Sequence, residues 1–470
     1  MPPILATVIT LAFVGWLFRR DFREKPNVTS ALWLPFLWVF ISGSRFPSGW
    51  LDIVGVHLGG TSVDDGSPLD ALFFCALIGA GIYVLHQRRV NVVEFCRNNQ
   101  WVTIYLAYCF LAILWSDIPL VALKRWIKLF GQPVMVLVLL TEPDPLESFT
   151  RLLKRLAYIW IPVSILFTRY YPFLGRAFDG WTGMPMNTGI TTNKNVLGCD
   201  CFIVGLFFIW HFLRVRRQEP GPARRSEMLL CLSFLALTAW VLHMAHSSTS
   251  IGALALGTAL MLVVGFDFVD RQRIGTYLVV TLVVGASAEW LFGIHNLALS
   301  LLGRDSTLTG RTDVWHMLLN WNINPIFGVG FESFWQEDRM AQIEAMNPGL
   351  VINESHNGYL ETYINMGMLG VAITLAMLFA TFWKARRALL DNFDFGRFRF
   401  AYLAAFIIYN WTEAAFRTHS VPFFMFFLIA IDYPSVWESE SVTEDIHPPE
   451  TDEDPDAVHK GDIPAHGSSV

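Results

Sequence analysis

The residues best suited to chemistry lie in a polar stretch at about 295–360, between long apolar runs. Its last part reads NESHNGYL at 353–360 and contains His356. An imidazole titrates near neutral pH and accepts a proton from a hydroxyl group, so His356 is a candidate general base. If a helix begins near Ser355, His356 and Tyr359 share one face of it. The alternative is a surface histidine with an ordinary hydrogen bond.

Arg311 is the second candidate, in the sequence GRTDVW at 310–315. The spacing after it predicts a short amphipathic helix along the membrane interface, with its Trp and Leu residues buried. On that helix Arg311 shares a face with Trp315, Leu318 and Leu319, and the polar side chains of Asp313, His316 and Asn320 take the opposite face. A guanidinium group held there suits a phosphate. The alternative is an arginine that extends to lipid headgroups.

Three further lysines are candidates for a second phosphate contact. Lys194 lies in GITTNKNVLG at 189–198, beside Asn195, and a plain interfacial anchor is the alternative for it. Lys124 and Lys128 are four apart within an apolar run and therefore share a helix face. Charges so deep in a span are costly and usually face the interior of the bundle. If that span begins later, they lie instead at its outer edge.

Other ionisable and small polar residues give weaker indications. Asp200, His243 and Glu289 are also candidates for buried ionisable groups. The sequence HSSTSIG at 246–252 joins two apolar runs almost without a loop, and its small hydroxyl residues favour close helix packing over substrate contact.

The elements that must position these residues are membrane helices. Of the 470 residues 53% are hydrophobic and only 16% are charged, against about a quarter in soluble chains. Apolar runs of about 17–22 residues match a hydrocarbon layer about 30 Å thick, and in lipid such runs must be helical. We therefore predict an all-α polytopic bundle of about 12–13 spans. Thirteen runs occur, at about 3–18, 28–41, 68–85, 101–115, 120–140, 152–168, 195–213, 227–245, 250–266, 274–294, 361–383, 399–414 and 420–436.

Lys and Arg are concentrated in alternate connections, which predicts the orientation of the chain. The N-terminus and the polar stretch are expected outside, and the C-terminus in the cytoplasm. Four parts follow: a transmembrane bundle at 1–294, a large external loop with short amphipathic helices at 295–360, C-terminal helices at 361–436, and an acidic tail at 437–470. The tail combines Asp and Glu with Pro and is expected to be disordered.

Several classes of protein are excluded by the motifs that the sequence lacks. There is no Walker loop, no dinucleotide-binding glycine motif and no His-Glu-x-x-His zinc motif. The six cysteines lie in predicted spans or in one basic loop, which indicates neither a disulfide framework nor a metal site. We expect no cofactor and no nucleic-acid partner. Because the outer face has no nucleotide pool, chemistry there requires a pre-activated donor in the membrane.

Taken together, these stretches resemble the O-antigen ligase and polysaccharide polymerase superfamily of bacterial membrane proteins, and more closely its exopolysaccharide-production polymerases. The similarity rests on five short sequences in the family's order: 189–198, 247–252, 310–315, 325–331 and 355–360. The chain departs from many relatives at 247–252, where it has no basic residue. The second phosphate contact is therefore open among Lys194, Lys124 and Lys128.

The resemblance implies a metal-independent enzyme of the bacterial inner membrane with a periplasmic active face. Such proteins move glycan from an isoprenoid (undecaprenyl) diphosphate carrier onto an acceptor hydroxyl of lipid A core or of another carrier-linked glycan. It implies His356 as general base and Arg311 as the phosphate ligand, with Asn195, Asn357 and Tyr359 as further substrate-binding residues. Membrane lipids and proteins of polysaccharide assembly and export are the other expected partners.

Three functions compete at this point. A polymerase that makes an exopolysaccharide or O-antigen is the leading hypothesis, and an O-antigen ligase acting on lipid A core is its nearest alternative. A transporter or flippase for the lipid-linked glycan would place polar sites near the bilayer midplane, often in paired repeats, whereas here they gather on one face and no repeat is visible. A structural scaffold is the third possibility.

Overall fold

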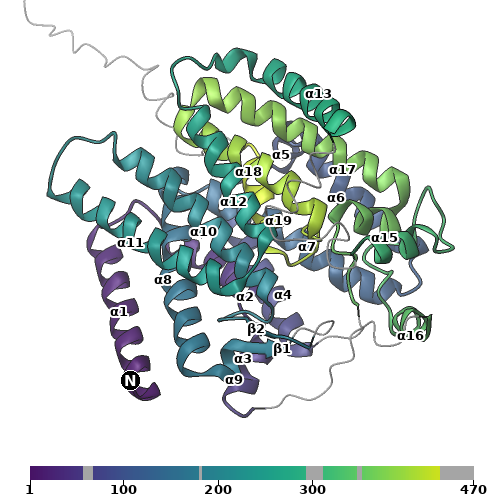
Figure 1. Ribbon diagram of the computed structural model, residues 1–470, viewed down its shortest axis with the longest axis horizontal. Helices are drawn as coiled ribbons and strands as arrows, with labels where there is room; N and C mark the ends of the chain where they lie inside the picture. The colour runs from purple at the N-terminus through teal and green to yellow at the C-terminus, as the bar shows by residue number, and fades with distance from the viewer. Residues whose placement is uncertain (57–66, 179–182, 293–310, 347–351, 434–470) are drawn as a thin grey trace, which may run out of the picture.

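The computed structural model describes residues 1–56, 67–178, 183–292, 311–346 and 352–433. The beginning of the polar stretch, residues 295–310, and the acidic tail at 437–470 lie outside these described residues. Within them the protein is a helical bundle with one small β-hairpin, β1 (Arg176–Phe178) and β2 (Pro185–Asn187), at its edge (Figure 1). The predicted all-α architecture is confirmed.

Each of the thirteen apolar runs contains a helix, because a long apolar segment satisfies its amides most fully within itself. The long helices are α1 (Pro3–Arg23), α4 (Pro68–Gln87), α7 (Pro119–Leu140), α8 (Pro145–Tyr170), α10 (Lys194–Val215), α11 (Pro222–Ala245), α13 (Ile274–Phe292), α17 (Gly358–Asp391) and α18 (Phe393–Thr412). The shorter apolar helices are α2 (Trp33–Ser42), α6 (Gln100–Leu111), α12 (Ser248–Val263) and α19 (Val421–Ala430). By length and composition, five described helices are able to cross a membrane: α1, α4, α10, α11 and α17.

The remaining elements are short and connect the long helices. They are α3 (Pro47–Ile53), α5 (Val92–Asn98), α9 (Pro172–Gly175), α15 (Arg311–Leu319) and α16 (Glu337–Met346), with 3-10 turns at Ser30–Leu32, Ala112–Trp115 and Arg271–Arg273. Figure 1 shows α15 and α16 beside one end of α17, at the periphery of the bundle. The external loop was expected to contain short helices of this kind.

The centre of the bundle is formed by α8, α10, α18 and α19, whose side chains are buried almost throughout. Helix α1 lies at the edge, and apolar side chains such as Ile4, Val8 and Trp16 remain exposed along it. In a membrane protein such an exposed apolar surface is the one that contacts lipid.

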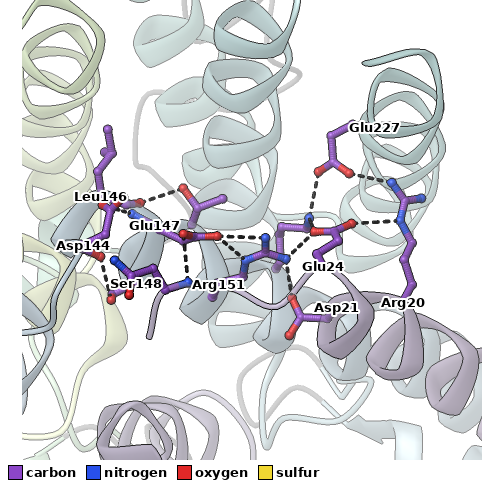
Figure 2. Close-up of polar contacts among 12 residues, drawn as sticks. Arg20, Asp21, Glu24, Asp144, Leu146, Glu147, Ser148, Arg151 and Glu227 are labelled. Atoms are coloured by element: carbon purple, nitrogen blue, oxygen red, sulfur yellow. Dashed lines mark hydrogen bonds and ion pairs between the residues drawn. The ribbon is translucent and has the colours of Figure 1, made fainter. Parts of the chain in front are cut away.

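An ion network holds α1 against α8 and α11 (Figure 2). Arg151 of α8 lies 2.9 Å from Asp21, and Arg155 binds the other oxygen of the same carboxylate at 2.8 Å. Arg20 of α1 reaches Glu227 of α11 at 2.6 Å. Buried charges persist only when paired, so this network fixes the position of a helix that has little apolar contact of its own.

The sequence NPIFGVGF at 324–331 docks against a break in α17. Gly367, with φ +67, interrupts this helix, and a Cβ there would collide with the carbonyl oxygen of Ile326. Gly330 has φ +106, and a Cβ on it would lie 2.5 Å from Cα of Ser116. Both positions therefore require glycine, and the motif fixes the loop that follows it against the bundle.

Candidate functional site

Arg311 begins α15, and its side chain reaches the connection between α18 and α19. Nη2 lies 3.0 Å from Oε1 of Glu413, and Nη1 donates a hydrogen bond to the carbonyl oxygen of Thr412. Only 15% of the Arg311 side chain is exposed. The guanidinium group is therefore held by the protein in a fixed orientation.

The helix predicted after Arg311 is present, and it packs on α17 through Val314 and Leu318. Trp315 on the same helix donates from Nε1 to the carbonyl oxygen of Ser355 at 2.9 Å. This bond joins α15 to the residue that precedes His356. Leu319 is 56% exposed on the protein surface, so its predicted burial in the membrane interface stays a prediction. The face that packs on α17 passes through Val314 and Leu318 and leaves Leu319 outside it.

His356 lies in the loop before α17 with φ +50, a left-handed conformation that is strained for a residue other than glycine. Its Nδ1 lies 2.9 Å from Oε1 of Glu354 and 3.7 Å from Oε2 of Glu413. Helix α17 begins only at Gly358, so the expectation of a helix from Ser355 is wrong. The reason is that the Asn357 side chain caps the helix, which leaves His356 outside it.

Glu413 is the point where three predicted site residues meet. Arg311 contacts one of its oxygens, and His356 and the Nδ2 of Asn195, at 3.3 Å, contact the other. Arg417, four residues after Glu413, binds Oε2 of Glu354 at 2.7 Å. The result is a charge cluster of five residues in which cations and carboxylates alternate: Arg311, Glu413, His356, Glu354 and Arg417.

The contacts of the charge cluster shift the pKa values of His356 and Glu354. Burial alone would lower the pKa of His356, but its contacts with the Glu354 and Glu413 carboxylates outweigh burial and raise that pKa to about 9. Burial also opposes ionisation of Glu354, yet His356 and Arg417 hold the pKa of this carboxyl group at about 2. At neutral pH His356 is therefore cationic. The cluster then has three basic groups, Arg311, His356 and Arg417, against two acidic ones, which suits an anion.

Two cavities adjoin the charge cluster. The first, here called the cationic cavity, measures about 330 Å³, and its wall has an excess of basic over acidic residues: Lys124, Arg125, Lys128 and Arg417 against Glu332 and Glu361. The second, here called the polar cavity, measures about 230 Å³ and includes both carboxylates of the cluster. Phe46, Arg417 and His419 line both cavities, so the two are neighbours.

The other predicted site residues are distributed unevenly over these cavities. Lys124 and Lys128 line the cationic cavity, and Asn195 lines the polar cavity. Lys194 is the first residue of α10. It is not among the residues that line either cavity. The linings also omit Arg311 and His356, which contact the Glu413 and Glu354 carboxylates of the polar cavity.

Asn357 and Tyr359 have structural partners. Asn357 Oδ1 accepts hydrogen bonds from the amides of Tyr359 and Leu360, both at 3.0 Å. The Tyr359 hydroxyl donates to the carbonyl oxygen of Ile407 at 3.0 Å. These contacts fix the start of α17 and its distance from α18, so both residues support the position of His356.

The sequence HSSTSIG at 246–252 packs tightly, as its small residues suggested. A Cβ on Gly198 of α10 would lie 2.5 Å from Cβ of Ser247, so the two helices approach closely here. Thr249 pairs with Thr412, the residue before Glu413, at 2.8 Å. This packing brings α12 and α10 against the end of α18 that carries the charge cluster.

Glu413, Arg417 and His419 were not singled out from the sequence. They occur in TEAAFRTHS at 412–420, a short polar connection between two apolar runs. The available signal was the concentration of three ionisable residues in so short a connection. Glu413 is 6% exposed, so it is not an ordinary surface charge.

A metal ion is one possible occupant of the charge cluster. Glu354, His356 and Glu413 each offer a ligand atom, and these atoms lie within 4.8 Å of one another. However, each carboxylate already has an arginine partner: Arg311 binds Glu413 and Arg417 binds Glu354. These guanidinium groups supply the positive charge that a metal would bring, so the donor set fits an internal ion-pair network better than a metal centre.

The fold defines the class of protein as a helical, multi-pass membrane protein, since five of the described helices are long and apolar enough to cross a membrane. Residues 231–375 match the family model for O-antigen ligase. This range includes Arg311 and His356 and excludes residues 189–198 and the connection that carries Glu413.

The chain is also similar to the exopolysaccharide production protein ExoQ of Rhizobium meliloti (strain 1021). The two are 24% identical over 310 residues, which cover 63% of this chain and 67% of ExoQ. Both matches are similarities, one to the O-antigen ligase family model and one to an exopolysaccharide production protein.

Proposed function

We propose that the protein extends a polysaccharide by transferring glycan from an isoprenoid diphosphate carrier to a hydroxyl group of an acceptor glycan. The observation that carries this proposal is the convergence of Arg311 and His356 on Glu413. One of these groups suits a departing phosphate and the other a reacting hydroxyl, and a transfer reaction needs both in one place. The similarity to ExoQ supports polymerisation over ligation to lipid A core.

The cationic cavity is the proposed site for the carrier diphosphate. Lys124, Arg125 and Lys128 come from one face of α7, and Arg417 enters from the α18–α19 connection. Aromatic residues, Phe46 and Phe74 among them, form the apolar part of the wall. A cavity with cations at one part and aromatic rings at another suits a phosphate attached to an isoprenoid chain. It also supplies the second phosphate contact in addition to Arg311.

In the proposed reaction the acceptor oxygen attacks the anomeric carbon of the donor sugar. The bond from that carbon to the diphosphate oxygen breaks, and the isoprenoid diphosphate leaves as an anion that Arg311 stabilises. Nδ1 of His356 faces Glu354, so Nε2 is the ring nitrogen that accepts the hydroxyl proton. Because His356 is cationic at neutral pH, it must first lose a proton to act as this base.

We propose that this reaction takes place at the periplasmic face of the inner membrane and needs no metal ion. The alternation of basic connections supports the sidedness, and the arginine partners of both cluster carboxylates support metal independence. Lipid-linked glycans are then both donor and acceptor, and proteins of polysaccharide assembly and export are the expected partners in the cell.

The experiment is a chain-extension assay with purified protein in detergent and lipid-linked repeat units extracted from a strain that lacks the gene. Wild-type protein is expected to form longer chains, and Arg311→Ala and His356→Ala to form almost none. Activity in detergent also separates transfer from transport, because detergent leaves no second compartment. Wild-type extension by both variants would overturn the assignment of the site.

A further inference from the structure

Asp200 is a buried acidic residue in the first third of the apolar helix α10. It is 1% exposed, and a Cβ added to Gly43 would lie 3.1 Å from its Oδ1, so the surrounding backbone is close. Neither carboxylate oxygen has a hydrogen-bond partner among the residues that the structure describes. A polar group buried in this way costs free energy unless something binds it, and in a membrane helix it marks a functional position.

Two more buried polar atoms without a partner in the described part of the chain lie around the same space. They are Oγ of Ser42 and Nε of Arg45, and both residues line the polar cavity together with Asp200. Nε of Arg45 only donates hydrogen bonds, whereas the serine hydroxyl donates and accepts and a carboxylate accepts. A ligand that satisfies all three must carry several groups able to donate and accept, which is the character of a sugar with its hydroxyl groups.

The position of the polar cavity connects it to the proposed reaction. Glu354 and Glu413, the two carboxylates that contact His356, form part of its wall. Through Phe46, Arg417 and His419 it adjoins the cationic cavity. A sugar in the polar cavity therefore has its hydroxyl groups next to the charge cluster, in a cavity that the lysines of α7 do not line.

The charges of the two cavities distinguish their ligands. In the polar cavity Arg45 and Arg417 are matched by Glu354 and Glu413, whereas in the cationic cavity four basic residues face only two acidic ones, Glu332 and Glu361, so a diphosphate is favoured in the cationic cavity. The volume of the polar cavity, about 230 Å³, is below the usual range of ligand pockets, about 300–1,000 Å³, so it holds one sugar ring rather than a longer segment.

We propose that the polar cavity binds the terminal sugar of the acceptor glycan, with Asp200 and Arg45 as the residues that select it. This inference rests on the transfer reaction proposed above and assigns its two substrates to different cavities. The cationic cavity holds the donor diphosphate, and the polar cavity holds the acceptor saccharide. The sugar hydroxyl groups then donate to Asp200 the hydrogen bonds that no described residue donates to it.

The test measures saccharide binding separately from transfer. The probe is the repeat-unit oligosaccharide released from its lipid carrier by mild acid, which carries no diphosphate. Its Kd is measured by tryptophan fluorescence or thermophoresis for wild type, Asp200→Asn and Asp200→Leu in detergent. Loss of a hydrogen-bonded sugar contact should raise Kd about tenfold in Asp200→Asn and more in Asp200→Leu.

Asp21→Asn is the matched control, since Asp21 is also a buried carboxylate but belongs to the ion network of Figure 2 and lines neither cavity. It should bind the oligosaccharide as wild type does. Melting temperatures of all variants show whether each is folded. In the extension assay, Asp200→Asn should raise KM for the free oligosaccharide acceptor with little change in KM for the lipid-linked donor.

Three results would overturn the inference. One is a wild-type Kd in both Asp200 variants, and another is an absence of saccharide binding by folded wild-type protein. The third is a binding signal from sodium ions that Asp200→Asn removes while saccharide binding persists, which would make Asp200 a cation ligand. The binding test and the transfer test can fail separately. If the Arg311 and His356 variants still extend chains while the saccharide binds, the proposed mechanism is overturned and the sugar site is retained.

Discussion

Arg311 and His356, forty-five positions apart in the sequence, contact opposite oxygens of one carboxylate, that of Glu413. Arg311 Nη2 is 3.0 Å from Oε1, and His356 Nδ1 is 3.7 Å from Oε2. A change at either residue therefore alters the electrostatic environment of the other. We expect their effects on transfer to be coupled rather than additive.

Glu413→Gln tests this coupling directly. The amide keeps the shape of the side chain but removes the charge that holds Arg311 and His356, so we expect chain extension to fall by about 10²-fold, within the range for misplaced catalytic groups. The measurement is kcat/KM with lipid-linked repeat units. Adding Arg311→Ala to Glu413→Gln should reduce the rate by much less than Arg311→Ala does alone. Independent effects in this double-mutant cycle would contradict the shared role of Glu413.

The pH profile tests the role of His356. As a base it must be neutral, and its pKa of about 9 places the rise of kcat/KM with pH near that value. Glu354→Gln removes a carboxylate that raises this pKa, so the rise should move toward neutral pH. If His356 instead acts as a fixed cation, kcat/KM will fall as the pH passes 9, and that result would reassign the base.

Stability at low pH follows from Glu354. Its pKa in the folded protein, about 2, is below the ordinary value of 4.5, so its ionised form stabilises the fold above pH 4.5. That contribution should decrease as the pH falls from 4.5 toward 2. Melting temperatures between pH 7 and pH 3 should therefore decline more steeply in wild type than in Glu354→Gln. Parallel declines would show that the ion pairs with His356 and Arg417 do not contribute to stability.

Metal removal tests the interpretation of the three potential ligands Glu354, His356 and Glu413. Since Arg311 and Arg417 already neutralise the two carboxylates, chain extension should be unchanged after incubation with EDTA and passage into metal-free buffer. Metal analysis of the purified protein accompanies the assay. A rate that falls with chelation and returns with one added divalent ion would replace the ion-pair network with a metal centre.

Lys128→Met tests the cationic cavity. Lys128 lines this cavity with its Nζ 5.4 Å from the ring of Phe74, and methionine keeps most of its apolar stem. We expect KM for the lipid-diphosphate donor to rise about tenfold, as for the loss of one charge-assisted contact. The inhibition constant of added undecaprenyl diphosphate should rise by a similar factor. Arg225→Met on α11, which lines neither cavity, is the control and should leave both quantities unchanged.

The sequence alone determined the helices and several local features. Thirteen apolar runs became helices because a bilayer leaves no other way to satisfy the backbone, and the helix after Arg311 followed from its apolar spacing. The expected start of the helix near Ser355 was wrong, because a side-chain cap competes there with continuation of the helix. The side chain of Asn357 caps α17, so the helix excludes His356.

Only the tertiary structure decided which residues form the site. Arg311, His356 and Asn195 occur in three separate segments, and Glu413, which they contact, belongs to a fourth. Their approach depends on the docking of residues 324–331 against the break at Gly367 and on the close packing of α10 with α12. Such contacts arise from the packing of whole helices, and no periodicity along one helix encodes which carboxylate of another helix lies opposite an arginine.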